Sequence, residues 1–113
     1  MNHTLKAVII EVTGGNIRNH HINLRGAYGF FPSDALGGAN EDVSANPISL
    51  RTSVETFDTD IDETKAIFRK RGEIRRFLKA ESVVEGDLLM IGLIDTRSYS
   101  LSKVSKRVFN NYL

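Results

Sequence analysis

The sequence predicts a mainly β, mixed α+β domain with a barrel-like arrangement of six or seven short strands and one clear helix. Three observations carry this prediction: short runs rich in β-branched residues, alternation of apolar and polar positions between turn residues, and one stretch with helical periodicity. The chain has 113 residues and is 41% hydrophobic. We therefore expect one compact domain, residues 1–113, with its own core.

Seven segments have the character of strands. The first, residues 5–13, is dense in β-branched side chains, and the others are alternating or short apolar runs bounded by turn residues. In order, the predicted strands are residues 5–13, 21–25, 48–53, 54–61, 67–71, 85–94 and 98–104. A polar arm, residues 14–20, separates the first two, and the fifth is expected to end at Gly72.

One segment has clear helical periodicity. In residues 73–83 the apolar positions Ile74, Phe77 and Leu78 follow the i, i+3, i+4 spacing of one helix face, with basic residues opposite. A shorter helical turn is expected over residues 32–36, before two glycines. The chain closes with a short amphipathic tail, residues 105–113.

The charge of the chain is balanced overall but unevenly placed. Fifteen basic and fourteen acidic residues leave a formal net charge of +1. Seven of the basic residues fall within one stretch, namely Lys65, Arg69, Lys70, Arg71, Arg75, Arg76 and Lys79. Any affinity for nucleic acid must therefore come from a local patch rather than from the total charge.

Composition excludes several classes of protein. The chain has no cysteine, which rules out disulfides, thiolate zinc sites and a Cys nucleophile. The beginning of the chain lacks a cleavage-type signal, and no apolar window approaches the length of a membrane span. We expect a soluble cytoplasmic protein that has no membrane partner and needs no cofactor.

Catalytic and metal motifs are weak or incomplete. Asp58–Asp62 has the spacing of a calcium loop, but Glu63 stands where Gly is needed and Arg69 where the bidentate Glu is needed. Two adjacent imidazoles, His20 and His21, cannot build a zinc site alone. There is neither a Gly-x-Ser-x-Gly elbow nor a phosphate-binding loop. We therefore expect no enzyme and no metal site in this chain.

Binding to nucleic acid needs only suitable side chains on exposed arms of a scaffold. The first arm carries Asn16, Arg18, Asn19 and His20, whose side-chain types pair with purine edges or phosphates. The second polar segment supplies carboxylates that can accept from cytosine amino groups, followed by the basic residues of the strand after it. Solvated loops would have the same composition, so these segments do not by themselves establish a binding site.

The order of parts resembles a known DNA-binding domain. The segment "RKRGEIRRFLKAESVVEGDLLMIGLIDTRSYSLSKV" is similar to the closing half of the DNA-binding pseudobarrel of plant B-three transcription factors and of the recognition domains of the restriction endonucleases EcoRII and BfiI. The matching residues are Gly72, Arg76, Phe77, Gly86, Asp87, Tyr99 and Leu101. The first half is compatible, and the segments "FFP", "GG" and "TDI…K.IFR.R" resemble a bacterial subgroup attached to restriction or modification enzymes.

The resemblance implies a seven-stranded open pseudobarrel with one or two short helices and two arms that grip the major groove. By position, the arms are residues 15–21, with Arg25 after them, and residues 58–71. It implies sequence-specific binding of double-stranded DNA, with any nuclease or methyltransferase in another domain or subunit. The expected DNA-binding residues are Asn16, Arg18, Asn19, His20, Arg25, Asp60, Lys65, Arg69, Lys70 and Arg71.

Two other classes of function stay open at this point, because a fold does not determine a function. The domain could be a regulatory or protein-interaction module on the same fold. It could also be a small metal-dependent nuclease that uses Asp60, Glu63 and Lys65, although a Glu-x-Lys match is common by chance.

Overall fold

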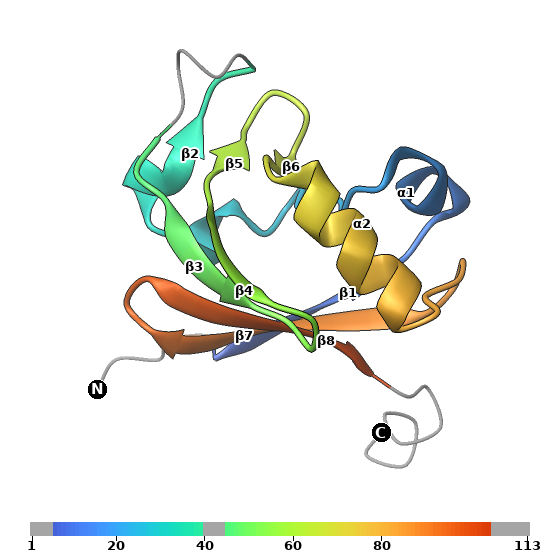
Figure 1. The fold of residues 1–113 in the computed structure, drawn as a ribbon. Coiled ribbons are helices and arrows are strands. Elements are labelled where there is room, and N and C mark those ends of the chain that lie inside the picture. The colour runs from blue at the N-terminus through green and yellow to red at the C-terminus, as the bar shows by residue number, and fades with distance from the viewer. Residues whose placement is uncertain (1–5, 40–44, 105–113) are drawn as a thin grey trace.

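The computed structural model describes residues 6–39 and 45–104, and it is a mixed α+β fold built mostly of strands, with two α-helices and two open sheets (Figure 1). The predicted fold class is therefore confirmed. No helix in these two ranges is long and apolar enough to cross a membrane. The elements are β1 (Ala7–Glu11), α1 (Gly14–Asn19), two 3-10 turns (Tyr28–Phe30 and Ser33–Ala35), β2 (Leu36–Gly37), β3 (Ile48–Arg51), β4 (Thr56–Thr59), β5 (Ile61–Asp62), β6 (Ile67–Phe68), α2 (Arg71–Ala80), β7 (Leu88–Asp95) and β8 (Ser98–Val104).

The larger sheet has five strands in the order β1-β7-β8-β3-β4. Strands β7 and β8 form an antiparallel hairpin in which Ile91 pairs with Leu101, whereas β3 runs parallel to β8 and pairs Leu50 with Tyr99. All four of these side chains are buried. Their alternation with polar or half-buried neighbours is the period-two pattern of a sheet that has one face in the core.

The smaller sheet has three short strands in the order β2-β5-β6, with β2 parallel to β5 and β5 antiparallel to β6. Ile61 pairs with Phe68, and both are fully buried. Figure 1 shows this sheet and both helices on the same side of the five-stranded sheet, so the turn between β5 and β6 projects on the side where α1 lies.

Helix α2 packs on the core through the predicted apolar face. Ile74, Phe77 and Leu78 are buried, whereas Arg75 and Lys79 are exposed. Arg76 is also exposed at its tip and binds the Glu55 carboxylate through Nε (2.6 Å) and Nη2 (3.1 Å). Arg75, Arg76 and Lys79 therefore belong to a solvated surface, as the periodicity of residues 73–83 predicts.

The predicted boundaries differ from the structure in five places. The arm after β1 contains the short helix α1, and residues 21–25 form no strand, although Ile22 and Leu24 are buried. The predicted strand over residues 67–71 ends at Phe68, and α2 begins before Gly72. The predicted strand over residues 54–61 is divided into β4 and β5, β2 is an additional short strand, and the predicted tail lies outside the described residues.

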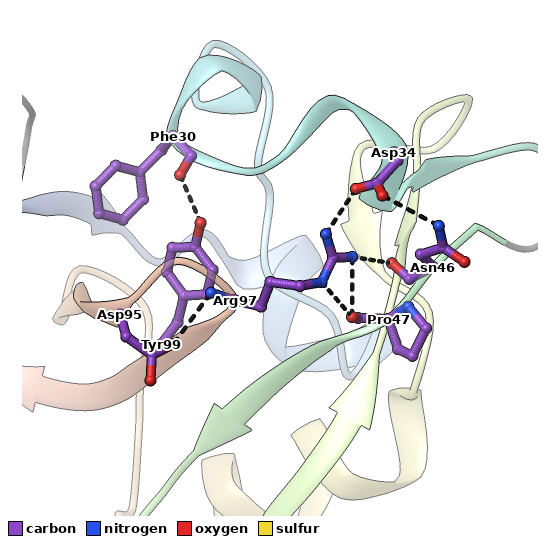
Figure 2. Close-up of polar contacts among 7 residues, drawn as sticks. All are labelled: Phe30, Asp34, Asn46, Pro47, Asp95, Arg97 and Tyr99. Carbon is purple, nitrogen blue, oxygen red and sulfur yellow. Dashed lines mark hydrogen bonds and ion pairs between the residues drawn. The ribbon is translucent and has the colours of Figure 1, made fainter.

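Arg97, in the turn between β7 and β8, ties three distant segments together (Figure 2). Its guanidinium donates to Asp34 Oδ1 at 2.8 Å and to the carbonyl oxygens of Asn46 (2.9 Å) and Pro47 (3.1 and 3.3 Å). The hydrogen bonds and charge of Arg97, with a hydrogen bond from Asn46, lower the pKa of the Asp34 carboxyl despite some desolvation. Nearby, the Tyr99 hydroxyl donates to the Phe30 carbonyl at 2.9 Å. These bonds fix the segment that carries β2 against the larger sheet.

Candidate nucleic-acid interface

The first arm is a short capped helix rather than an extended loop. Thr13 is the N-cap of α1: its hydroxyl accepts from the Asn16 amide (3.1 Å), and the Asn16 side-chain oxygen accepts from the Thr13 amide (2.9 Å). This reciprocal pair is a capping box, which satisfies two amides that the helix itself leaves without partners. Asn16 is 5% exposed. Its side chain serves the cap, and the structure does not present it to a ligand.

The last residues of the first arm face different parts of the molecule. His20 ends α1 in the left-handed region (φ 55°) and lines a mostly apolar groove with Ile17, Leu78 and Val83. A Cβ added at Gly14 would lie 3.2 Å from Arg18 Nη1 and 3.5 Å from the Glu85 carboxyl carbon, so Arg18 extends back along α1 toward Glu85. Neither side chain is brought to the second arm.

The centre of the second arm, residues 58–71, is the tight turn between β5 and β6. Asp62 Oδ1 accepts from the Lys65 amide at 3.0 Å, and Ala66 follows in the left-handed region with φ 61°. The Tyr28 hydroxyl donates to the Glu63 carbonyl at 2.8 Å and braces the turn from outside. Asp62 is buried by this arrangement, while the Lys65 side chain is exposed. The turn therefore presents a cation on a fixed backbone.

The two arms are joined by hydrogen bonds. Arg71 Nη2, at the start of α2, donates to the Asn19 carbonyl at 2.7 Å, across 52 positions of sequence. A second hydrogen bond runs from the Leu24 amide to the Ala66 carbonyl at 2.8 Å. Arg25 follows Leu24 in the sequence, and Lys65 precedes Ala66. These two bonds bring the backbone at the exposed residues Asn19, Arg25 and Lys65 together with the exposed residue Arg71, from three separate segments.

His21 lies at this junction and was not among the expected DNA-binding residues. Burial and then the charges of Arg71 and Lys65 lower its pKa below the ordinary value of 6.5. The sequence offers no signal for His21, because the two cations that act on it come from residues 44 and 50 positions away.

Asp60 and Arg69 form an internal ion pair. Arg69 Nε lies 2.7 Å from Asp60 Oδ1, Arg69 Nη2 donates to the Gly38 carbonyl at 2.6 Å, and Asp60 Oδ2 accepts from the Ala45 amide at 2.8 Å. Their side chains are 5% and 14% exposed, respectively. Burial acts to raise the pKa of Asp60, but the hydrogen bonds from Arg69 and Ala45 and the charge of Arg69 lower it overall. Both side chains are thus committed to holding β5 and β6 against the segments at Gly38 and Ala45.

Lys70 lies apart from the junction. It is the N-cap residue of α2, its amide donates to Thr59 Oγ1 at 3.2 Å, and its side chain is exposed. It lines an open pocket with Asp58, Thr59 and Pro47. Lys70 therefore sits on the β4 side of the second arm.

Two of the four carboxylates of the second arm are buried, so only the other two are available at the surface. Asp60 and Asp62 are buried and hydrogen-bonded, whereas Asp58 and Glu63 are exposed. Across residues 6–39 and 45–104, no group of three or more His, Cys, Asp or Glu side chains is arranged to hold a metal ion. The arrangement that remains is cationic, with Arg25, Lys65 and Arg71 on a rigid backbone, which suits an anionic ligand.

Comparison with known proteins finds a similarity of fold. The chain resembles the solved N-terminal domain of Helicobacter pylori LlaJI.R1 with a TM-score of 0.67 and 17% sequence identity, over 96% of this chain and 98% of that one. No protein-family model and no curated protein matches the sequence. At this level of identity the match establishes the fold.

Proposed function

We propose that this domain recognises a specific sequence in double-stranded DNA through the major groove, as the recognition module of a restriction-modification system. The observation that carries the proposal is the hydrogen bond from Arg71 to the Asn19 carbonyl, because it holds two polar arms together beside exposed cations. Rigid arms with a cationic surface supply both requirements of duplex recognition, which are phosphate contacts for position and side chains that reach base edges.

The similarity of fold supports the biological setting of this proposal. The similar solved structure is the N-terminal domain of LlaJI.R1, and this fits the resemblance of the sequence to the recognition domains of restriction endonucleases. By analogy, residues 1–113 act as one DNA-binding domain whose partner is a nuclease or methyltransferase domain or subunit. A fold analogy alone does not assign a function, so the argument rests mainly on the side chains.

We assign the contacts by exposure and by existing partners. Lys65, Lys70 and Arg71 are exposed cations that bind phosphates, with Arg25 beside Lys65. Arg18 and Asn19 are exposed polar side chains of α1 that read base edges. The Asn19 side-chain amide donates to the Gly15 carbonyl at 3.0 Å, which leaves its oxygen available.

Four expected contacts are left out of the proposal because the structure gives their side chains other surroundings. Asn16 belongs to the helix cap, and Asp60 and Arg69 bind each other. His20 lines the apolar groove beside α2. Because Asp60 is engaged by Arg69 and Ala45, the nuclease alternative built on Asp60, Glu63 and Lys65 is not proposed.

Selection of bound duplexes from a random pool tests the proposal, and it should be run with and without cytosine methylation. Recovery of one enriched motif is the expected result, with the methylated pool showing whether a methyl group in the major groove alters it. Recovery of unselected sequence alone, from a protein that binds duplex at low salt, contradicts sequence-specific recognition.

Two substitutions separate base readout from backbone contact. Arg18→Ala should relax the preference at one position of the motif, whereas Lys70→Ala should weaken binding to all sequences alike. Arg75→Ala is the matched control, since Arg75 is an exposed cation one turn beyond Arg71 on α2 and makes no side-chain hydrogen bond or ion pair within the described residues. Equal behaviour of all three variants would contradict the assigned roles.

A further inference from the structure

We propose that His21, Lys65 and Arg71 form a single-phosphate site, and that His21 takes up a proton when a backbone phosphate of the duplex occupies it. The inference rests on the proposed function, because the duplex supplies the phosphate. It adds a residue to the interface and makes the binding of DNA dependent on pH.

The backbone places His21 directly at the junction of the two arms. His20 turns the chain through the left-handed region, and the His21 amide then donates to the Asn16 carbonyl at 3.1 Å. Arg71 reaches the same end of α1, with Nη2 on the Asn19 carbonyl at 2.7 Å. An arginine has five N–H donors, so this contact leaves Arg71 donors for a phosphate. His21 is half-buried, which limits its access to water on one side.

Lys65 reaches the junction from the β5–β6 turn. Its backbone is held by Asp62 Oδ1, and the next residue, Ala66, is hydrogen-bonded to Leu24 in the segment that follows His21. The backbone of the turn is thus fixed at Lys65 and at Ala66, and the exposed Lys65 side chain extends from it. The charges of Lys65 and Arg71 both lower the pKa of His21, as expected of cations that lie near its imidazole.

Among the residues that the structure describes, none of the charged groups that act on His21 is an anion that would stabilise its protonated form. Lys65 comes from the β5–β6 turn and Arg71 from α2, and the carboxylates nearest to them in sequence on these two elements are Glu63 and Glu73. Glu73 is engaged by Arg76 at 3.4 Å, and Glu63 is exposed. Within the described residues, no carboxylate contributes to the shift of His21, so two cations and burial favour the neutral imidazole.

A phosphate bound between Lys65 and Arg71 reverses this balance. The added negative charge favours the imidazolium, so the pKa of His21 in the complex is higher than in the free protein. Between the free and the bound values, the complex holds one proton more than the separate partners. Linkage then requires affinity to rise as pH falls through that window, by at most about tenfold per pH unit for one proton.

Fluorescence anisotropy with a labelled duplex, from about pH 8 to about pH 5.5 at fixed ionic strength, measures this linkage. For the wild type we expect binding to strengthen as pH falls. His21→Gln, which keeps the size and a polar edge, should lose most of this dependence. His20→Gln is the matched control and should retain it, because His20 lines the groove on the other side of α1.

A second measurement tests the phosphate site without relying on duplex binding. In NMR titrations of the free protein, the His21 ring should titrate below 6.5, and both inorganic phosphate and the duplex should move it upward. If the wild type binds duplex but its pH dependence is absent or survives in His21→Gln, the proton-linked site is refuted while DNA recognition stands. If no duplex binds at any pH, the proposed function fails, and an unchanged His21 titration with inorganic phosphate refutes this site as well.

Discussion

Arg71 Nη2 donates a 2.7 Å hydrogen bond to the backbone carbonyl of Asn19, and this bond joins the first turn of α2 to the last turn of α1. The carbonyl at the end of a helix has no partner within the helix, so the arginine also serves as a C-terminal cap from a distant segment. One side chain therefore sets the spacing of the two arms while it carries a positive charge at the surface.

Replacement of Arg71 should weaken both functions of this side chain. For Arg71→Gln we expect duplex affinity to fall roughly tenfold, since a charged contact to phosphate and the link between the arms are lost together. Amide hydrogen exchange should be faster in α1 because its end loses an anchor. Arg75→Gln should change neither quantity, and a duplex affinity equal to wild type in Arg71→Gln would contradict the role given to Arg71.

The Asp60–Arg69 pair should act on stability rather than on sequence preference. Asp60→Asn removes the negative charge from this mostly buried ion pair, which costs roughly 3 kcal/mol of unfolding free energy. Urea unfolding measures this change, with Asp58→Asn as the exposed control. A stable Asp60→Asn variant with an altered recognition motif would instead assign Asp60 to base readout.

The same pair predicts the sign of a pH dependence. Because Arg69 and the Ala45 amide hold the pKa of folded Asp60 below its ordinary 3.8, the ionised carboxylate stabilises the fold above that value. This stabilisation is lost as pH falls from 3.8 through the folded pKa. Stability curves of wild type and Asp60→Asn should therefore converge in acid, and parallel curves down to low pH would contradict the ion pair.

Loss of the helix cap should loosen the first arm. Thr13→Ala removes the hydroxyl that accepts from the Asn16 amide, and an N-cap loss of this kind costs about 1 kcal/mol. Denaturant unfolding measures the cost, and Thr13→Ser should restore most of the stability because it keeps the hydroxyl. If Thr13→Ser is as unstable as Thr13→Ala, the cap is not the reason.

The sequence alone predicts an element correctly where its local pattern of apolar residues matches the residues that the fold buries. The apolar run of β7, the alternation in β8 and the spacing of Ile74, Phe77 and Leu78 depend on residues close in sequence, and the two strands and the helix that they predict are confirmed. The character of Arg75, Arg76 and Lys79 as a scaffold surface follows from the same periodicity. The Glu55 partner of Arg76 lies 21 positions away, and no local pattern indicates it.

The sequence was insufficient where particular side-chain or backbone contacts, most of them between residues far apart in the chain, determine the structure. "GGNIRNH" reads as a loop because of its glycines, yet the Thr13–Asn16 capping box makes it helical. "HIN" alternates like a strand, but Leu24 bonds to Ala66 rather than to a strand ladder. Asp60 and Arg69 have the side-chain types of a DNA contact, and only their 2.7 Å pairing indicates a structural role. His21 was missed because its neighbours come from residues 44 and 50 positions away.

The salt dependence of duplex binding tests the central claim most directly. If Lys65 and Arg71 together neutralise one phosphate and Lys70 neutralises a second, the slope of log affinity against log salt should be about −1.8 for the wild type. It should become shallower by about 0.9 in Lys70→Ala and stay unchanged in Arg75→Ala. The account predicts this pattern together with saturable binding to an enriched motif, whereas absence of duplex binding at low salt would contradict it.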